Sequence, residues 1–158
     1  MNIPFIDLKA QYGRLKPEID AGIERVLERG RFILGPEVGE FEAALAAHVG
    51  VAHVVSCANG TDALTLALMG ENIGPGDAVF IPGFTFTATA ETVLMVGAEP
   101  VFVDVDGENF LIDHADLERR IAAVKAAGSL TPRAVIPVDL FGLPADYEAL
   151  AKISEAHD

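Results

Sequence analysis

The residues of this sequence best suited to chemistry lie in the turn Asn59-Gly60-Thr61-Asp62. An apolar segment, residues 52–57, precedes the turn and is predicted to be a strand. A helix is predicted from Thr61 to about residue 70. The first amides of a helix have no partner within it, and they lie at the positive end of its dipole. Together with the Thr61 hydroxyl, these amides could bind an anion, above all a phosphate group.

The same turn also has a purely structural interpretation. Asn59 is a good helix-capping residue, and the acidic Asp62 follows three positions later, as in a helix cap. From spacing alone, this cap is favoured over phosphate binding. The turn contains neither the glycine triplet of dinucleotide-binding folds nor a Walker loop, so those motifs do not support a phosphate site.

From this turn onward, strands and helices are predicted to alternate. Strands are expected at 52–57, 78–82, 100–105 and 133–138, and helices at 61–70, from about 89 to Gly97, from Asp113 onward, and at about 146–157. Such alternation predicts βαβ units, a mostly parallel sheet and an α/β fold. Ligands of these sheets bind outside the carboxyl ends of the strands. The segments expected there are 59–62, 83–86, 104–106 and 139–142.

Two further helices are predicted before the alternation begins. One runs from about 15 to 29, with Pro17 in its first turn and Gly30 at its end, and the other spans about 37–48. Residues 1–13 are expected to form an extended arm that could pack on a partner subunit. Phe32 lies in the loop between the helices, and it is expected to be a buried anchor of that loop rather than part of a pocket.

Other side chains near the predicted strand ends allow several interpretations. Either Phe84 or Phe86 could lie against a flat cofactor, or both could belong to the core. Asp104 and Asp106 could be acids, caps or metal ligands. No second ligand cluster accompanies them, and the four histidines lack metal-ligand spacing, so no metal site is expected. Cys57, at the end of an apolar segment, is expected to be a buried thiol.

Composition and charge limit the class of protein further. The chain has 158 residues, of which 51% are apolar, and a formal net charge of −13. The length predicts a single domain, and the apolar content excludes disorder as its main state. The acidic charge argues against nucleic acid and anionic membranes as partners. The single cysteine fits the reducing cytoplasm, and no signal pattern or membrane-spanning apolar run is found.

Several stretches, taken together and in order, resemble the N-terminal half of the DegT/DnrJ/EryC1/StrS family of sugar aminotransferases. These enzymes are fold type I proteins that depend on pyridoxal 5′-phosphate. The resemblance implies an α/β, three-layer large domain with a mostly parallel sheet that is incomplete in this chain: residues 1–13 as the arm and 14–158 as the N-terminal part of the cofactor-binding domain. The matching stretches are 4–8, 30–38, 59–64, 82–89, 100–106 and 139–142.

The resemblance also implies a role for particular residues. Gly60 and Thr61, with Asn59, are expected to hold the cofactor phosphate, and Phe86 rather than Phe84 is expected to stack on the pyridine ring. Gly30 and Phe32 match the stretch that approaches the nucleotide-sugar substrate. The nearest subgroup acts on 3-oxo-UDP-N-acetylglucosaminuronic acid, with glutamate as amino donor, in surface polysaccharide biosynthesis. A cytoplasmic homodimer is expected for the full-length form.

The residues that perform the family's chemistry are not expected in this chain. The aspartate that pairs with the pyridine nitrogen and the Schiff-base lysine come later in the family. None of the lysines here follows a strand in a loop facing the proposed site; they are Lys9, Lys16, Lys125 and Lys152. The chain is therefore expected to be part of a longer enzyme or a truncated copy of one. Two alternatives remain: a non-catalytic binding or interaction module, and a pyridoxal-phosphate-dependent sugar dehydratase of the same family.

Overall fold

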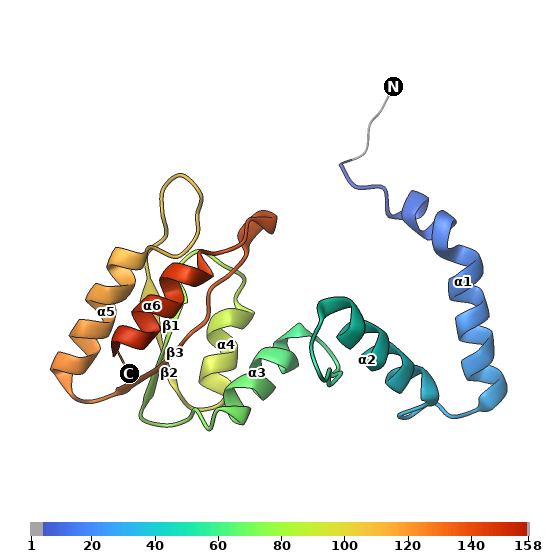
Figure 1. Cartoon of the computed structure of the whole chain (residues 1–158), viewed down its shortest axis with the longest axis horizontal. Coiled ribbons are helices and arrows are strands. Elements are labelled where there is room, and N and C mark those ends of the chain that lie inside the picture. Colours follow the sequence, from blue (N-terminus) through green and yellow to red (C-terminus); the bar gives the residue numbers. More distant parts are fainter. Residues whose placement is uncertain (1–4, 158) are drawn as a thin grey trace. The chain divides into compact units, whose positions relative to one another are not determined.

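The computed structural model describes residues 5–157, which divide after Ser56 into two compact units (Figure 1). The first unit contains the helices α1 (Leu8–Arg29) and α2 (Pro36–Val49). The second contains α3 (Gly60–Gly70), β1 (Asp77–Pro82), α4 (Ala88–Met95), β2 (Glu99–Val103), α5 (His114–Ala127), β3 (Thr131–Val135), the short 3-10 helix η1 (Leu140–Gly142) and α6 (Tyr147–His157). None of these helices combines the length and apolarity needed to cross a membrane.

The first helix begins earlier than the sequence pattern indicated. The Asp7 carboxylate caps α1 by accepting a hydrogen bond from the amide of Ala10, at 2.9 Å, so residues 8–13 are helical. The extended conformation predicted for them is wrong, and Pro17 lies inside the helix rather than in its first turn. Residues 1–4 of the predicted arm lie outside the described residues. Gly30 ends the helix with φ 63°, as predicted.

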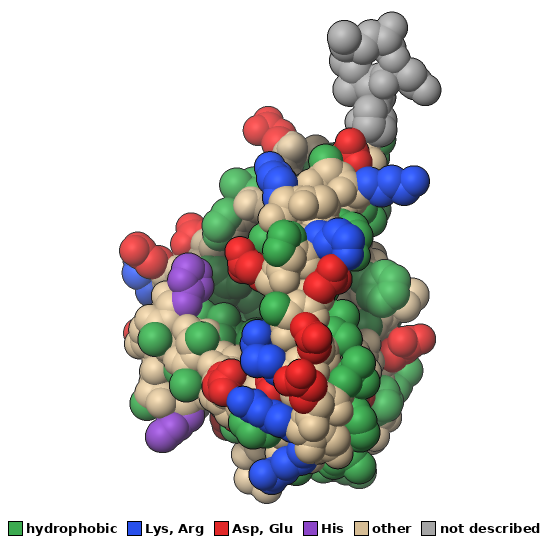
Figure 2. Space-filling model, turned by 90° about the vertical axis from the view of Figure 1, so that its right-hand side faces the viewer, with side chains coloured by type: hydrophobic (Ala, Val, Ile, Leu, Met, Phe, Trp, Pro, Cys, Tyr) green, Lys and Arg blue, Asp and Glu red, His purple; other side chains and the backbone are tan. Residues whose placement is uncertain are grey.

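The helices of the first unit bury none of their residues. Apolar side chains nevertheless follow one stripe of α1 at helical spacing, and each is exposed: Leu8, Tyr12, Leu15, Ile19, Ile23 and Leu27. Figure 2 shows uncovered hydrophobic side chains among charged ones of both signs on the face that it draws. Phe32 is 68% exposed, so the prediction of a buried loop anchor is wrong. Arg29 pairs with Glu37 at 2.6 Å, which ties the end of α1 to the start of α2.

The predicted strand at 52–57 does not form. No strand pairs with this segment among the described residues, and a lone extended segment leaves its backbone groups without partners. The segment is held by Glu42 of α2, which accepts hydrogen bonds from the amide and the hydroxyl of Ser56, both at 2.8 Å. These bonds, that of the amide first, lower the pKa of Glu42. Cys57 is exposed, so the expectation of a buried thiol is also wrong.

The second unit is built on a three-stranded parallel sheet in the order β2-β1-β3. Phe80 of β1 is in register with Val101 of β2 on one side and Val135 of β3 on the other. Each strand is joined to the next through a helix, α4 between β1 and β2 and α5 between β2 and β3. The parallel sheet and the α/β class predicted from the alternation are confirmed.

Helices cover both faces of the sheet, because successive side chains of β1 point to opposite sides. Ala78 and Phe80 pack against one core cluster, to which α5 contributes Leu117 and α6 contributes Leu150. Val79 and Ile81 pack against the other cluster, built from residues of α3 and α4 such as Leu68 and Val93. Figure 1 shows the corresponding three layers. The three-layer arrangement expected for the domain is confirmed.

A buried carboxylate ties α5 to the carboxyl end of β2. Asp116 is 5% exposed and accepts a hydrogen bond from the amide of Asp104 at 2.7 Å. Arg119 and Arg120 also donate to it, at 3.0 and 3.3 Å. The Asp104 amide, helped by the two arginines, holds the pKa of Asp116 below its ordinary value although burial acts to raise it. This carboxylate fixes the point at which the chain leaves β2.

We predict that the charge of Asp116 stabilises the second unit. Asp116→Asn should lower the free energy of unfolding by about 1 to 2 kcal/mol at pH 7, since hydrogen bonds to a charged group contribute more than neutral ones. Because the pKa of Asp116 is lowered by folding, its contribution is present above about pH 4. It is lost as the pH falls through the lowered pKa. Urea unfolding followed by circular dichroism from pH 7 to pH 3 measures both effects.

Glu118→Gln provides the control, because Glu118 is an exposed residue of the same helix. Its unfolding free energy should match that of the unmodified chain within about 0.5 kcal/mol. Equal stability of the Asp116→Asn variant and the unmodified chain at pH 7 would contradict the role given to Asp116.

Candidate functional site

A hollow of about 580 Å³ lies at the carboxyl edge of the sheet in the second unit. We call it the carboxyl-edge hollow. Its walls come from the start of α3, the loop after β1 with the start of α4, the segment after β3, and the start of α6. The lining residues with the clearest chemical character are Gly60, Thr61, Phe86, Asp139 and Tyr147. Three residues predicted for the site, Gly60, Thr61 and Phe86, therefore line one hollow.

The start of α3 offers donors to this hollow. Asn59 caps the helix: its side-chain oxygen accepts a hydrogen bond from the amide of Asp62 at 2.9 Å, and its amide nitrogen donates to the Asp62 carboxylate at 3.1 Å. The carbonyl of Asn59 accepts from the amide of Ala63. The amides of Gly60 and Thr61 come before those of Asp62 and Ala63 in the helix, and they have no hydrogen-bond partner among the described residues. The cap therefore leaves two backbone donors, beside the Thr61 hydroxyl, for an anion.

The two phenylalanines after β1 differ in their surroundings. Phe86 is 76% exposed and lines the hollow. Phe84 instead packs with two other rings, Phe110 at 5.6 Å between centroids and Phe141 at 6.5 Å. A hydrogen bond of 3.1 Å between the hydroxyls of Thr85 and Thr89 links the loop that carries both to α4. Phe86 is thus the ring whose face is available to a flat group in the hollow.

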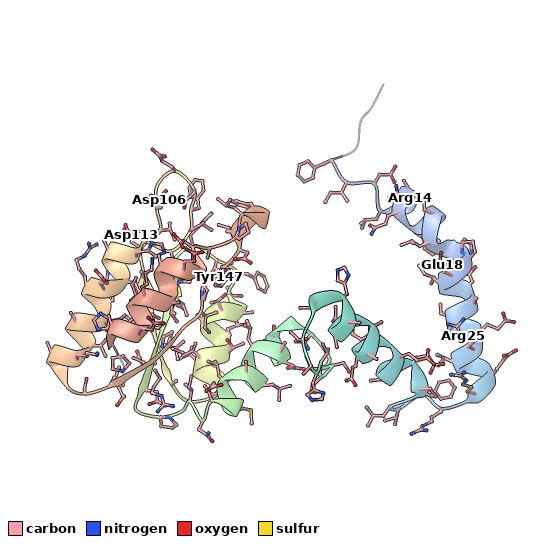
Figure 3. The ribbon with its side chains drawn as sticks, in the orientation of Figure 1. Arg14, Glu18, Arg25, Asp106, Asp113 and Tyr147 are labelled. Carbon is pink, nitrogen blue, oxygen red and sulfur yellow. The ribbon has the colours of Figure 1, made fainter. Side chains whose placement is uncertain are left out.

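A hydrogen-bonded pair forms a polar part of the wall. Asp139, in one of the segments expected at the sheet edge, accepts hydrogen bonds at one carboxylate oxygen from the Tyr147 hydroxyl and the Ala145 amide, both at 2.9 Å. The hydrogen bond to Asp139, and then burial, raise the pKa of Tyr147 above its ordinary value. Figure 3 labels Tyr147 at the start of α6. The sequence pattern did not indicate this residue, because its spacing with Leu150 and Ile153 is that of a core face.

The remaining candidates are not among the residues that line the hollow. Asp106 lies in the loop after β2, where it accepts hydrogen bonds from the amides of Glu108 and Asn109, and these bonds lower its pKa, that of Asn109 most. Gly30 and Phe32 belong to the first unit, and their role toward a substrate stays a prediction. Among residues 5–157, no three histidine, cysteine, aspartate or glutamate residues are grouped as they are in metal sites.

Comparison with known proteins shows which family the chain resembles. A model of the DegT/DnrJ/EryC1/StrS aminotransferase family matches residues 14–158. The UDP-2-acetamido-2-deoxy-3-oxo-D-glucuronate aminotransferase of Pseudomonas aeruginosa is 50% identical over 157 residues, which are 98% of this chain and 41% of the relative. The UDP-N-acetyl-3-dehydro-alpha-D-glucosamine 3-aminotransferase of Acidithiobacillus ferrooxidans is 48% identical, over 98% of this chain and 40% of the relative.

Solved structures show the same likeness. A DegT DnrJ EryC1 StrS aminotransferase from Brucella abortus superposes with a TM-score of 0.94 and 54% identity, covering 99% of this chain and 42% of its own. DesV of S. venezuelae, solved in complex with a ketimine intermediate, superposes with a TM-score of 0.87 and 42% identity, over 98% of this chain and 40% of its own. The chain spans about two fifths of the length of the Pseudomonas aeruginosa and Acidithiobacillus ferrooxidans relatives.

The family resemblance found in the sequence is therefore confirmed over nearly the whole chain, by the family model and by both kinds of relative. The residues that line the carboxyl-edge hollow all fall within the matched range, 14–158. This chain belongs to the DegT/DnrJ/EryC1/StrS aminotransferase family.

Proposed function

We propose that this chain is the phosphate- and ring-binding part of a pyridoxal 5′-phosphate-dependent aminotransferase. The observation that carries the proposal is the carboxyl-edge hollow, because the free donors at the start of α3 and the exposed face of Phe86 line the same space. The enzyme transfers an amino group, with glutamate as donor, to a keto-sugar linked to a nucleotide.

The residues present fit this cofactor. A phosphate dianion requires hydrogen-bond donors, and the amides of Gly60 and Thr61 with the Thr61 hydroxyl supply them at the positive end of α3. The acidic residue of that first turn, Asp62, is engaged by Asn59. The pyridine ring requires an apolar surface, which Phe86 offers together with Leu64 and Ala88. When bound, the cofactor supplies the carbonyl group that takes up the amino group and the ring that withdraws electrons.

In our proposal, this chain's own residues bind and orient the cofactor. They do not carry out the proton transfer that amino transfer requires. None of the described residues that line the hollow is a lysine. Lys125 of α5 donates to the backbone carbonyl of His157 at 2.7 Å, and Lys9, Lys16 and Lys152 belong to α1 and α6. We therefore assign neither the Schiff-base lysine nor the base to a described residue that lines the hollow.

The names of the relatives support the class of substrate. The Pseudomonas aeruginosa and Acidithiobacillus ferrooxidans relatives, at 50% and 48% identity, are both named for amino transfer to a UDP-linked sugar with a 3-oxo or 3-dehydro group. These names favour transamination of a 3-oxo sugar nucleotide over the dehydratase alternative. We propose that Gly30 and Phe32 lie near this substrate. We also propose that the whole protein is a cytoplasmic homodimer.

We predict that Thr61→Val weakens binding of pyridoxamine 5′-phosphate about tenfold. The valine keeps the shape of the side chain but removes one hydrogen bond to the phosphate. A hydrogen bond to a charged group contributes about 1.5 kcal/mol or more, and about 1.4 kcal/mol corresponds to a tenfold change in affinity. Isothermal titration of the chain with pyridoxamine 5′-phosphate measures this affinity. This ligand is chosen because it carries an amine and cannot form an imine with surface lysines.

Thr65→Val is the matched control for this measurement. Thr65 lies one turn further along α3, and its hydroxyl donates to the carbonyl of Thr61 at 3.0 Å rather than lining the hollow. Its affinity should stay within about twofold of the unmodified chain. If Thr61→Val and Thr65→Val bind the ligand equally well, Thr61 does not hold the phosphate.

A second prediction separates ring binding from phosphate binding. Phe86→Leu should weaken binding of pyridoxamine 5′-phosphate about threefold to tenfold, since an aromatic contact contributes about 0.5 to 1.5 kcal/mol beyond its buried area. Affinity for inorganic phosphate, measured by competition, should not change. Phe84→Leu is the control, because Phe84 packs with Phe110 and Phe141 instead of lining the hollow. An equal loss in both variants would refute the assignment to Phe86.

A further inference from the structure

The carboxyl-edge hollow carries a negative charge that the binding of a phosphate does not explain. Asp139 is the only charged side chain among the described residues that line it. The salt bridges of the described residues do not include Asp139. Among the residues that the structure describes, its carboxylate is therefore paired with no cation.

The surrounding contacts hold Asp139 in place and engage only one of its two carboxylate oxygens. One carboxylate oxygen accepts from Ala145 and from Tyr147, whereas the other receives no hydrogen bond from the described residues. The amide of Ile136 donates to the carbonyl of Phe80 at 2.9 Å, which ties the segment leading to Asp139 to the central strand. The Tyr147 hydroxyl donates a hydrogen bond to Asp139, so the lone pairs of its own oxygen remain available to accept one.

The hollow thus has two chemically different parts. At the start of α3 it presents donors and the positive end of a helix, and at Asp139 and Tyr147 it presents acceptors and a negative charge. A ligand that fits both parts carries a phosphate and, apart from it, a cationic group that donates hydrogen bonds. Pyridoxamine 5′-phosphate has these features, because its amine is protonated at neutral pH. Pyridoxine 5′-phosphate has the same shape with a neutral hydroxyl in place of the ammonium.

We propose that Asp139, positioned by Tyr147 and Ala145, makes the hollow selective for a cationic amino group, so that this site binds the amino form of the cofactor more tightly than neutral forms. The inference rests on the proposed function, since it concerns the same hollow. Its consequence for the enzyme is retention of the amino form of the cofactor until the keto-sugar arrives. Asp139 would then be a specificity-determining residue of the site.

The test compares the affinities of pyridoxamine 5′-phosphate and pyridoxine 5′-phosphate by isothermal titration. The unmodified chain should prefer pyridoxamine 5′-phosphate about tenfold. Asp139→Asn keeps an oxygen to accept the bonds from Tyr147 and Ala145 but removes the charge. This variant should bind both ligands with affinities within about twofold of each other, and its affinity for pyridoxine 5′-phosphate should be nearly unchanged, which also shows that the hollow is still formed.

Asp106→Asn is the matched control, because it removes the same charge from a loop residue that does not line the hollow. It should keep the tenfold preference. If the unmodified chain and Asp139→Asn show the same ratio of affinities, the inference is wrong and the phosphate site stands. If neither ligand binds the unmodified chain, the proposed function is wrong as well.

Discussion

The site depends on the pairing of β1 with a parallel strand on each side. The buried residues of β1 alternate between two core clusters, with Ala78 and Phe80 on one face of the sheet and Val79 and Ile81 on the other. Helices must therefore cover both faces, and because all three strands run the same way, their carboxyl ends meet at one edge. The loops after β1 and β3 reach this edge, and they bring Phe86 and Asp139 to one hollow, although 53 positions separate them in the sequence.

The two interpretations of the turn at Asn59 prove compatible. A side chain can cap only part of the first turn of a helix, and Asn59 takes the amide of Asp62 while its carbonyl takes that of Ala63. The amides of Gly60 and Thr61 remain for a ligand. The cap also fixes Asp62, whose carboxylate would otherwise be free to oppose a phosphate. Structural capping and the anion binding that we propose would thus use different groups of the same turn.

The sequence predicted best what short-range patterns determine. The alternation of apolar segments located β1, β2 and β3 within three residues at each end, and the Asp113 cap located α5. Prediction from the sequence failed where contacts between residues far apart in the chain determine the structure. Residues 52–57 are apolar enough for a strand but find no partner among the described residues, and Tyr147 follows the spacing of a core face but turns to Asp139. At residues 8–13 the Asp7 cap and the continuing apolar stripe were present in the sequence, but Pro4 and the polar residues 9–13 argued against a helix, and Pro17 was expected in the first turn.

The most direct test of phosphate binding at the start of α3 is a nuclear magnetic resonance titration of the ¹⁵N-labelled chain. Its amide spectrum would be recorded with pyridoxamine 5′-phosphate and, separately, with pyridoxamine, which lacks the phosphate. We expect the amide protons of Gly60 and Thr61 to move to lower field with the phosphorylated ligand and to change far less with the other. Unchanged Gly60 and Thr61 resonances, with the largest shifts in another segment, would contradict a phosphate site at this helix.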